Sequence, residues 1–395
     1  RQDYQQRLTV SAQLMPVRDL TIDLNLDKTF GKMYSELYKD TTGTGDHFAR
    51  LNPYASGSFS ISYISFQTLF EKIKQNEVSE TFQKFQDYRI ILSKRLAEQN
   101  PYWQSLPASE KFLPDGFYNG YSRYAQDVLL PAFIAAYTGK DPLSVALLKQ
   151  SNPNIRSNPF SGYLPKPNWR ITYTGLPRIR GMEKIFTNFT ISHGYTGTLG
   201  MNSFNSALFF EDPFGLGYPR FIDTVSNNFV PYFLVPNITI SEQFSPLLDL
   251  DMQFTNQLTA KFGYSKSRTL SLSLVDFQLS ENRSTEFTIG AGYRQRGAFS
   301  WIKWKGKPLE NDVTFRLDFS LRDDVTSNSR LDQEQALPTS GQKVITIAPS
   351  IDYVISNRVN IKFYFDQRRV EPKISTSPPI VNTRAGIQLR VALAQ

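Results

Sequence analysis

The feature that most constrains the fold of this chain is an alternation of apolar and polar residues that recurs along most of its length. Apolar residues alternate with polar ones over Leu8 to Leu14, and the pattern resumes over Leu20 to Leu26 after a turn. A two-residue period places apolar side chains on one face of a β-strand and polar side chains on the other. The same period recurs near residues 57–68, 168–175, 187–198, 201–210 and 230–243, and then almost without pause to the end. The sequence therefore predicts an all-β protein built from antiparallel hairpins.

Two kinds of protein share this pattern. A soluble antiparallel sheet with one face on a core has the same alternation. A transmembrane barrel is favoured because the predicted strands run about ten residues, the apolar rows carry no charge in their middles, and aromatic residues gather near strand ends. Lipid cannot satisfy an open sheet edge, so such strands have to close into a barrel. We predict a transmembrane β-barrel of the outer-membrane type.

One block of the chain has a helical period instead. Phe82, Phe85, Ile91, Leu92 and Leu96 fit a helix that starts near Ser79. Another helix is predicted over residues 124–137, and Asp141 before Pro142 is typical of the start of a third. We therefore predict barrel strands over residues 1–70, a helical insertion over 71–167, and barrel strands over 168–395.

Connection lengths predict the side of the membrane on which each loop lies, because outer-membrane barrels have short periplasmic turns and longer extracellular loops. Short turns are predicted at Val17/Arg18, Leu199/Gly200, Ser245/Pro246, Lys266/Ser267 and Asn357. Long connections are predicted over Phe30–Ser56, Leu176–Phe186, Glu211–Phe229, Asp323–Ser340 and Arg369–Asn382. This pattern places the insertion and the C-terminus together in the periplasm. With about fifteen strands, an odd number, the first and last strands would run parallel, so the ring should not close with this chain alone.

Composition excludes several classes of chemistry. The chain has no cysteine and two histidines, His47 and His193, which removes disulfides, thiol nucleophiles and cysteine-ligated metals. Its 44 Lys and Arg against 36 Asp and Glu give a net charge of +8, but the basic residues are dispersed and match no nucleic-acid motif. Asp249 and Asp251 could serve as a glycosidase-like pair, although a role on the polar face of a strand is favoured. We predict no enzyme, no cofactor, no metal site and no nucleic-acid partner.

A transport role needs a polar lining rather than a catalytic group. The alternation assigns nine polar residues to the face away from lipid, which would line the lumen: Asp23, Asn25, Asp249, Asp251, Arg316, Asp318, Lys362, Asp366 and Arg390.

The sequence has no apolar run near the length of about 20 residues that a membrane-spanning helix needs. It also starts without a methionine or a recognisable signal peptide. These features lead us to expect a processed or truncated piece of a longer protein.

Particular motifs resemble a known family. They are DVLLPAFIAAYTGKD at 127–141, PNWRITYTG at 167–175, ISHGY at 191–195, NITISEQF at 237–244, YSKSRTL at 264–270 and TSGQK at 339–343. In this order the chain resembles, over nearly its whole length, the C-terminal region of the SprA/Sov family. These proteins are the giant outer-membrane translocons of the Bacteroidetes type IX secretion system, which is associated with gliding motility.

This resemblance implies a very large single-chain barrel in the cell outer membrane, with a lateral opening toward the bilayer. Folded cargo proteins with a C-terminal secretion signal would pass through its lumen. The implied partners are the remaining N-terminal part of the same barrel, a PorV-type shuttle barrel, a periplasmic plug protein and outer-membrane lipid. Family members are several times longer than this chain. A stand-alone porin or nutrient channel, and a soluble β-rich surface-binding module, remain as alternatives.

Overall fold

The computed structural model describes residues 1–71, 79–150, 154–297, 299–304, 307–309, 312–331, 336–356, 359–373 and 378–391. The long strands are β1 (Gln2–Leu14), β2 (Leu20–Asp40), β3 (Phe48–Ser62), β5 (Phe186–Ser206), β9 (Asn237–Phe254), β10 (Leu258–Ser273), β11 (Gln278–Gln295), β14 (Val313–Arg330), β15 (Ala336–Ser356), β16 (Val359–Pro372) and β17 (Ile380–Val391). The short strands are β4 (Asn168–Tyr173), β6 (Ile222–Asp223), β7 (Asn228–Phe229), β8 (Phe233–Leu234), β12 (Phe299–Trp304) and β13 (Lys307–Leu309). The α-helices are α1 (Glu80–Gln99), α2 (Pro101–Gln104) and α3 (Gln126–Thr138).

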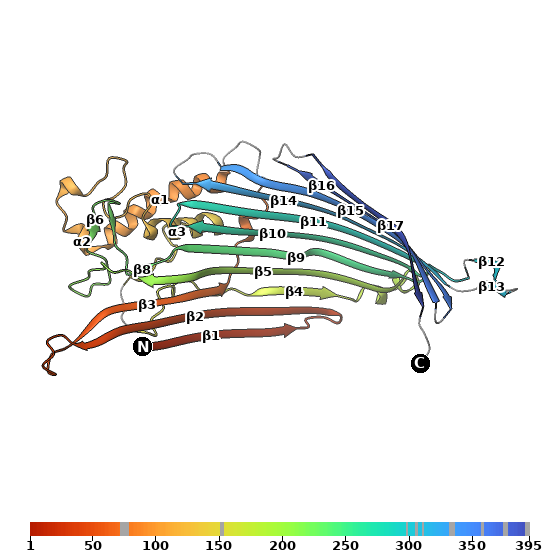
Figure 1. The fold of residues 1–395 in the computed structure, drawn as a ribbon, viewed down its shortest axis with the longest axis horizontal. Helices are drawn as coiled ribbons and strands as arrows, with labels where there is room; N and C mark the ends of the chain where they lie inside the picture. Colours follow the sequence, from red (N-terminus) through yellow and green to blue (C-terminus); the bar gives the residue numbers. More distant parts are fainter. Residues whose placement is uncertain are drawn as a thin grey trace.

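One sheet of 13 strands forms most of the molecule. Its long strands lie side by side in the order β1-β2-β3-β5-β9-β10-β11-β14-β15-β16-β17, and β4 and β8 pair beside this path. Every neighbouring pair is antiparallel. Figure 1 shows the strands as a broad twisted sheet, with the helices near one end and the β12–β13 hairpin at the other. The antiparallel hairpin architecture predicted from the alternation is confirmed.

The strands are longer than predicted. The predicted connections Phe30–Ser56 and Asp323–Ser340 lie largely inside strands, because β2 runs to Asp40, β3 starts at Phe48 and β14 runs to Arg330. Three predicted turns are also wrong. Leu199/Gly200 lies inside β5, Ser245/Pro246 inside β9 and Lys266/Ser267 inside β10. Glycine, proline and serine inside a strand often mark a bulge rather than a turn, and the β9–β10 register does shift near Ser245/Pro246. The predicted turn at Asn357 lies outside the described residues.

The helical insertion interrupts a single strand position. β3 pairs with the Lys28–Asp40 part of β2, and β4 pairs with its Leu20–Asn25 part. Both strands also pair with β5 on their other side. Strands β3 and β4 thus occupy the same position in the sheet, between β2 and β5. The chain leaves the sheet after Ser62 and returns to it at Asn168.

The insertion is built on two helices that pack together on the sheet. The Ser79 hydroxyl accepts a hydrogen bond from the Phe82 amide and caps α1, as predicted. Helix α3 is confirmed and is buried from Asp127 to Thr138 in spite of Pro131. The predicted helix after Asp141 is wrong, because the Asp141 side chain caps only a turn through the Leu143 amide. The main core forms where α1 and α3 meet Leu199, Ile240 and Leu272 of the sheet.

The predicted sidedness is wrong in one respect. The insertion lies near one end of the sheet, whereas β17 ends at the opposite end (Figure 1). The Leu176–Phe186 connection lies at that opposite end too, since the Arg178 guanidinium pairs with Asp19 at 2.7 Å beside the Val17/Arg18 turn. When one long strand is counted as two, the side of the membrane assigned to every later loop is reversed. The insertion and the C-terminal end of β17 therefore do not share a side.

The sheet is open. β1 and β17 are its edge strands, and within the described part of the chain no pairing joins them. The path contains eleven strands with antiparallel neighbours throughout, so β1 and β17 point in the same direction. The expectation that this chain would not close an antiparallel ring by itself agrees with this arrangement.

Candidate functional site

One face of the sheet carries a continuous apolar band. Across five neighbouring strands the register aligns Leu250, Phe262, Ile289, Phe319 and Ile347. On β14 the band covers residues 313–321, which is about 27 Å of strand at roughly 3.3 Å per residue. Ile289, Leu317 and Phe363 in this band expose 43%, 46% and 44% of their surface. Exposed apolar surface on this scale marks contact with lipid or with a protein partner.

Along each strand, this face passes from the exposed apolar band to a part that is buried under the insertion. Strand β10 shows both parts. Its side chains on this face are Phe262 and Tyr264 in the apolar band, Lys266 at its edge, and then Arg268, Leu270 and Leu272, which are buried under the insertion. An 18-residue strand such as β9 is about 60 Å long, whereas the apolar band of an outer-membrane barrel is about 25 Å tall. The strands therefore extend well beyond the band, and the insertion covers the extension.

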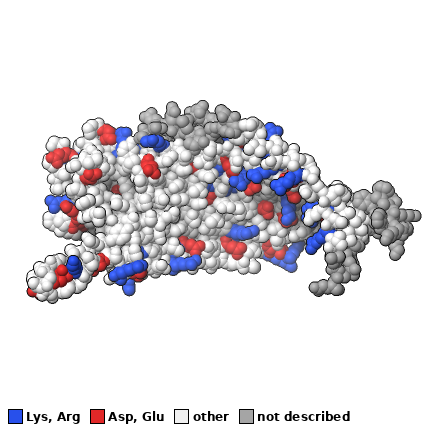
Figure 2. Space-filling view, viewed as in Figure 1, with Lys and Arg blue, Asp and Glu red and all other residues white. Residues whose placement is uncertain are grey.

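The opposite face is polar, and the register places all nine predicted lumen residues on it. Figure 2 shows acidic and basic side chains mixed over the part of the molecule away from the insertion, with a largely uncharged region nearer the helices. On β10 this uncharged region is a row of hydroxyl side chains: Ser265, Ser267, Thr269, Ser271 and Ser273.

Four of the predicted residues surround one hollow of about 850 Å³ on the polar face, or lie beside it. Asp251, Arg316 and Asp318 line this hollow, and Asp249 is the next residue along the same face of β9. The Asp251 carboxylate pairs with the Lys261 ammonium at 3.0 Å. Gly290 and Gly292 also line the hollow, and they leave it open because they have no side chains.

The other five predicted residues lie in two further places. Asp23 and Asn25 accept hydrogen bonds from the Gln13 amide at 2.8 Å and the Ser11 hydroxyl at 3.0 Å across the β1–β2 pair. The last three lie toward the other edge of the sheet, where Lys362 and Asp366 are on β16 and Arg390 is on β17. The nine residues thus form a distributed lining rather than one compact site.

Further charged residues on this face were not predicted. Lys261 and Arg294 line the large hollow, and Arg384 lies opposite Asp366. The same alternation could have predicted all three, since each occupies a polar position in the two-residue pattern of its strand.

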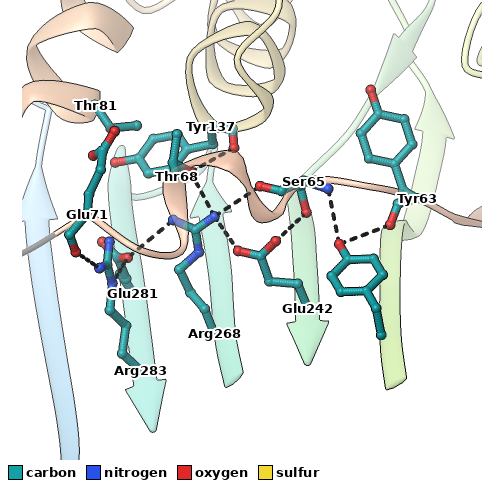
Figure 3. A network of polar contacts seen from close by, with 11 residues as sticks. Tyr63, Ser65, Thr68, Glu71, Thr81, Tyr137, Glu242, Arg268, Glu281 and Arg283 are labelled. Atoms are coloured by element: carbon teal, nitrogen blue, oxygen red, sulfur yellow. Dashed lines mark hydrogen bonds and ion pairs between the residues drawn. The ribbon is translucent and has the colours of Figure 1, made fainter. Parts of the chain in front are cut away.

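A buried ion network joins the insertion to the sheet (Figure 3). Arg268 on β10 pairs with Glu242 on β9, and neither side chain is exposed to solvent. Ser65, at the entry of the insertion, donates its hydroxyl hydrogen to Glu242 at 2.8 Å. Arg268 also donates to the Thr68 hydroxyl at 2.8 Å, and Thr68 in turn donates to the Tyr137 carbonyl at the end of α3.

The network continues onto β11. Arg283 donates to the Glu71 carbonyl at 2.6 Å, and Glu281 lies between Arg268 and Arg283. Residues from three strands thus hold both the entry segment and α3. The sequence contains a signal for this site. These charged residues occupy positions of β9, β10 and β11 where the alternation would otherwise place apolar side chains.

Asp127, in the first turn of α3, is predicted to make the stability of the insertion depend on pH. Burial raises the pKa of this carboxyl from 3.8 to about 7, against the lowering effect of hydrogen bonds from Gln126 and Gln150. Because the folded-state pKa lies above the unfolded-state pKa, the neutral carboxyl stabilises the folded protein at pH values below the unfolded-state pKa. This contribution is lost as the pH rises through about 7. The loss is at most about 4 kcal/mol between pH 4 and pH 7.

Hydrogen exchange of the α1 and α3 amides, corrected for intrinsic rates, measures this effect in the whole protein. We expect the opening free energy to fall over this pH range in the natural chain and to stay nearly level in Asp127→Asn. Equal pH slopes in the two proteins would show that Asp127 is not the responsible group.

The described residues contain no cluster of His, Asp or Glu side chains that could hold a metal ion. Within them, no helix is long and apolar enough to cross a membrane. Nδ1 of His193 lies 2.7 Å from the Leu247 carbonyl, so this histidine has a structural partner.

The predicted antiparallel all-β architecture with a helical insertion is confirmed. Its strands carry an apolar face that is exposed over the band and a polar face behind it. The insertion is confined to one end of that sheet.

No protein-family model matches the chain, and no curated protein matches it. Among solved structures it is similar to OmpT, an outer membrane protein of Vibrio cholerae folded in vitro, in its trimer form. That similarity has a TM-score of 0.22 and 8% sequence identity, and it covers 98% of this chain and 97% of the other. A TM-score this low does not define a shared fold.

Proposed function

We propose that this chain forms part of the wall of a protein-secretion channel in the cell outer membrane, of the type IX kind that its sequence resembles. The observation that carries the proposal is the pairing of an exposed apolar band with a polar face on the same antiparallel strands. In this proposal the apolar band faces lipid, and the polar face lines a lumen through which folded cargo proteins pass.

The open sheet supports a larger barrel. Unpaired backbone groups at β1 and β17 could not remain exposed in lipid, so further strands have to complete the ring. The resemblance identifies these strands with the remaining N-terminal part of the same barrel. A stand-alone porin or nutrient channel would instead need β1 and β17 of this chain to pair with each other, and these two edge strands run parallel.

The lining suits the passage of proteins rather than the binding of one solute. Acidic and basic groups alternate around the large hollow, as in the Asp251–Lys261 pair, and a row of hydroxyls lies nearer the insertion. A surface of mixed sign would not trap a cargo of either charge. Such transport needs neither a catalytic group nor a cofactor in this chain.

Native extraction in mild detergent tests the proposal, followed by identification of every chain that co-purifies. We expect the missing barrel strands, a PorV-type shuttle barrel, a periplasmic plug protein and cargo with a C-terminal signal. We also expect this chain to migrate differently in detergent gels with and without heating, as barrels do. A sealed ring made of this chain alone, with ion conduction and no partner, would contradict the secretion role and favour a porin.

A further inference from the structure

The helical insertion contains a cavity that the transport role does not use. It has a volume of about 320 Å³ and lies between the end of α1, the start of α3 and the loop over residues 216–219. Its walls include the apolar side chains of Leu96 and Leu147, the ring of Tyr121, and the polar side chains of Asp127 and Gln150. A cavity of this size lies at the lower end of the range of small-molecule sites.

Asp127 is a carboxyl group without a cationic partner among the described residues. It is buried, and the Gln150 amide donates a hydrogen bond to its Oδ1 at 2.6 Å. The carbonyl oxygen of that amide accepts from the Tyr232 backbone at 2.8 Å, which fixes the orientation of the Gln150 side chain. Burying an ionised carboxylate without a counter-ion costs several kcal/mol.

The other titratable groups that line the cavity do not neutralise this acid. Tyr121 is buried, and its hydroxyl accepts a hydrogen bond from Asn100 at 3.1 Å. Lys149 is exposed to solvent, and no ion pair joins it to Asp127. The cavity thus combines apolar walls with one acid that has no counter-ion, an arrangement that suits a cation on an apolar stem.

We propose that this cavity binds an organic cation, a primary ammonium or guanidinium group on a short apolar stem, with Asp127 as its counter-ion. The stem would lie against Leu96, Leu147 and Tyr121. The cation can belong to a free amine or to a lysine or arginine side chain of a peptide. This site is independent of the proposed transport role, so either proposal can fail without the other.

Calorimetric titration of the whole protein in detergent tests the site, with benzylammonium as the probe and benzyl alcohol as its uncharged analogue. We expect saturable binding of benzylammonium and none of benzyl alcohol. Burial raises the pKa of Asp127 to about 7, so affinity should be roughly 30-fold higher near pH 8 than near pH 5.5 if only the ionised acid binds. Capped lysine and arginine amides form a second arm, and their binding would identify a side chain as a competent source of the cation.

Three variants separate a charge effect from loss of structure. Asp127→Asn keeps the shape and an acceptor for Gln150, and we expect it to lose benzylammonium binding and the pH dependence. Asp87→Asn removes an equal charge from an exposed position on α1 and should bind normally. Leu147→Trp should block the cavity without a change in charge. Undiminished binding to Asp127→Asn, equal binding of benzyl alcohol, or no binding of any probe to the natural chain would overturn the proposal.

Discussion

Replacement of Glu242 by alanine should detach the helical insertion from the sheet at a cost of about 3–5 kcal/mol. The change leaves the Arg268 guanidinium buried without its main counter-ion, since both side chains are fully shielded from solvent. It also removes the acceptor of the Ser65 hydroxyl at the entry of the insertion. Hydrogen exchange and limited proteolysis of residues 79–150 would report the detachment while the sheet stays intact.

A matched control lies on the same strand. Asp251→Ala breaks the ion pair with Lys261, which is partly exposed to solvent, and should cost about 0–1 kcal/mol. A second variant tests the cause directly, because Glu242→Ala combined with Arg268→Met removes the orphaned charge and should recover much of the loss. Equal effects of Glu242→Ala and Asp251→Ala would show that the buried network does not hold the insertion.

Replacement of Leu317 by arginine should disrupt assembly into the membrane by about 2–4 kcal/mol. Leu317 lies at the middle of the apolar band on β14, and 46% of its surface is exposed on the face assigned to lipid. A cation there would have to leave water for hydrocarbon. The fraction of chain recovered in the outer membrane, and the free energy of unfolding in lipid vesicles, measure the effect.

The neighbouring residue supplies the control for this substitution. Asp318 points to the polar face, where it borders the large hollow, so Asp318→Asn should change assembly by less than about 1 kcal/mol. Equal tolerance at positions 317 and 318 would contradict the assignment of the two faces.

The sequence was sufficient to predict which way side chains point, because the two-residue period is a local property of a strand. All nine predicted polar residues share one face for this reason, from Asp23 on β2 to Arg390 on β17. Strand length was not predictable in the same way. Breakers such as Gly200 and Pro246 are found inside strands of 21 and 18 residues, where the pairing with neighbours continues past them.

That error in length had a further consequence. Each false turn reverses the side assigned to the next loop, so the relative placement of the insertion and the C-terminus was wrong even though the helices α1 and α3 were predicted correctly. The buried network was missed for a different reason. Glu242, Arg268 and Arg283 meet only through cross-strand register and through contact with Ser65 and Thr68, which are about two hundred residues away from Arg268.

Cysteine accessibility along β14 tests the two-faced wall most directly. The natural chain has no cysteine, so single substitutions at positions 315–321 create unique labelling sites. In intact outer membranes, a water-soluble maleimide should label positions 316, 318 and 320 and leave 315, 317, 319 and 321 largely unmodified. Equal labelling at odd and even positions, or protection of the even ones, would contradict a wall with lipid on one side and water on the other.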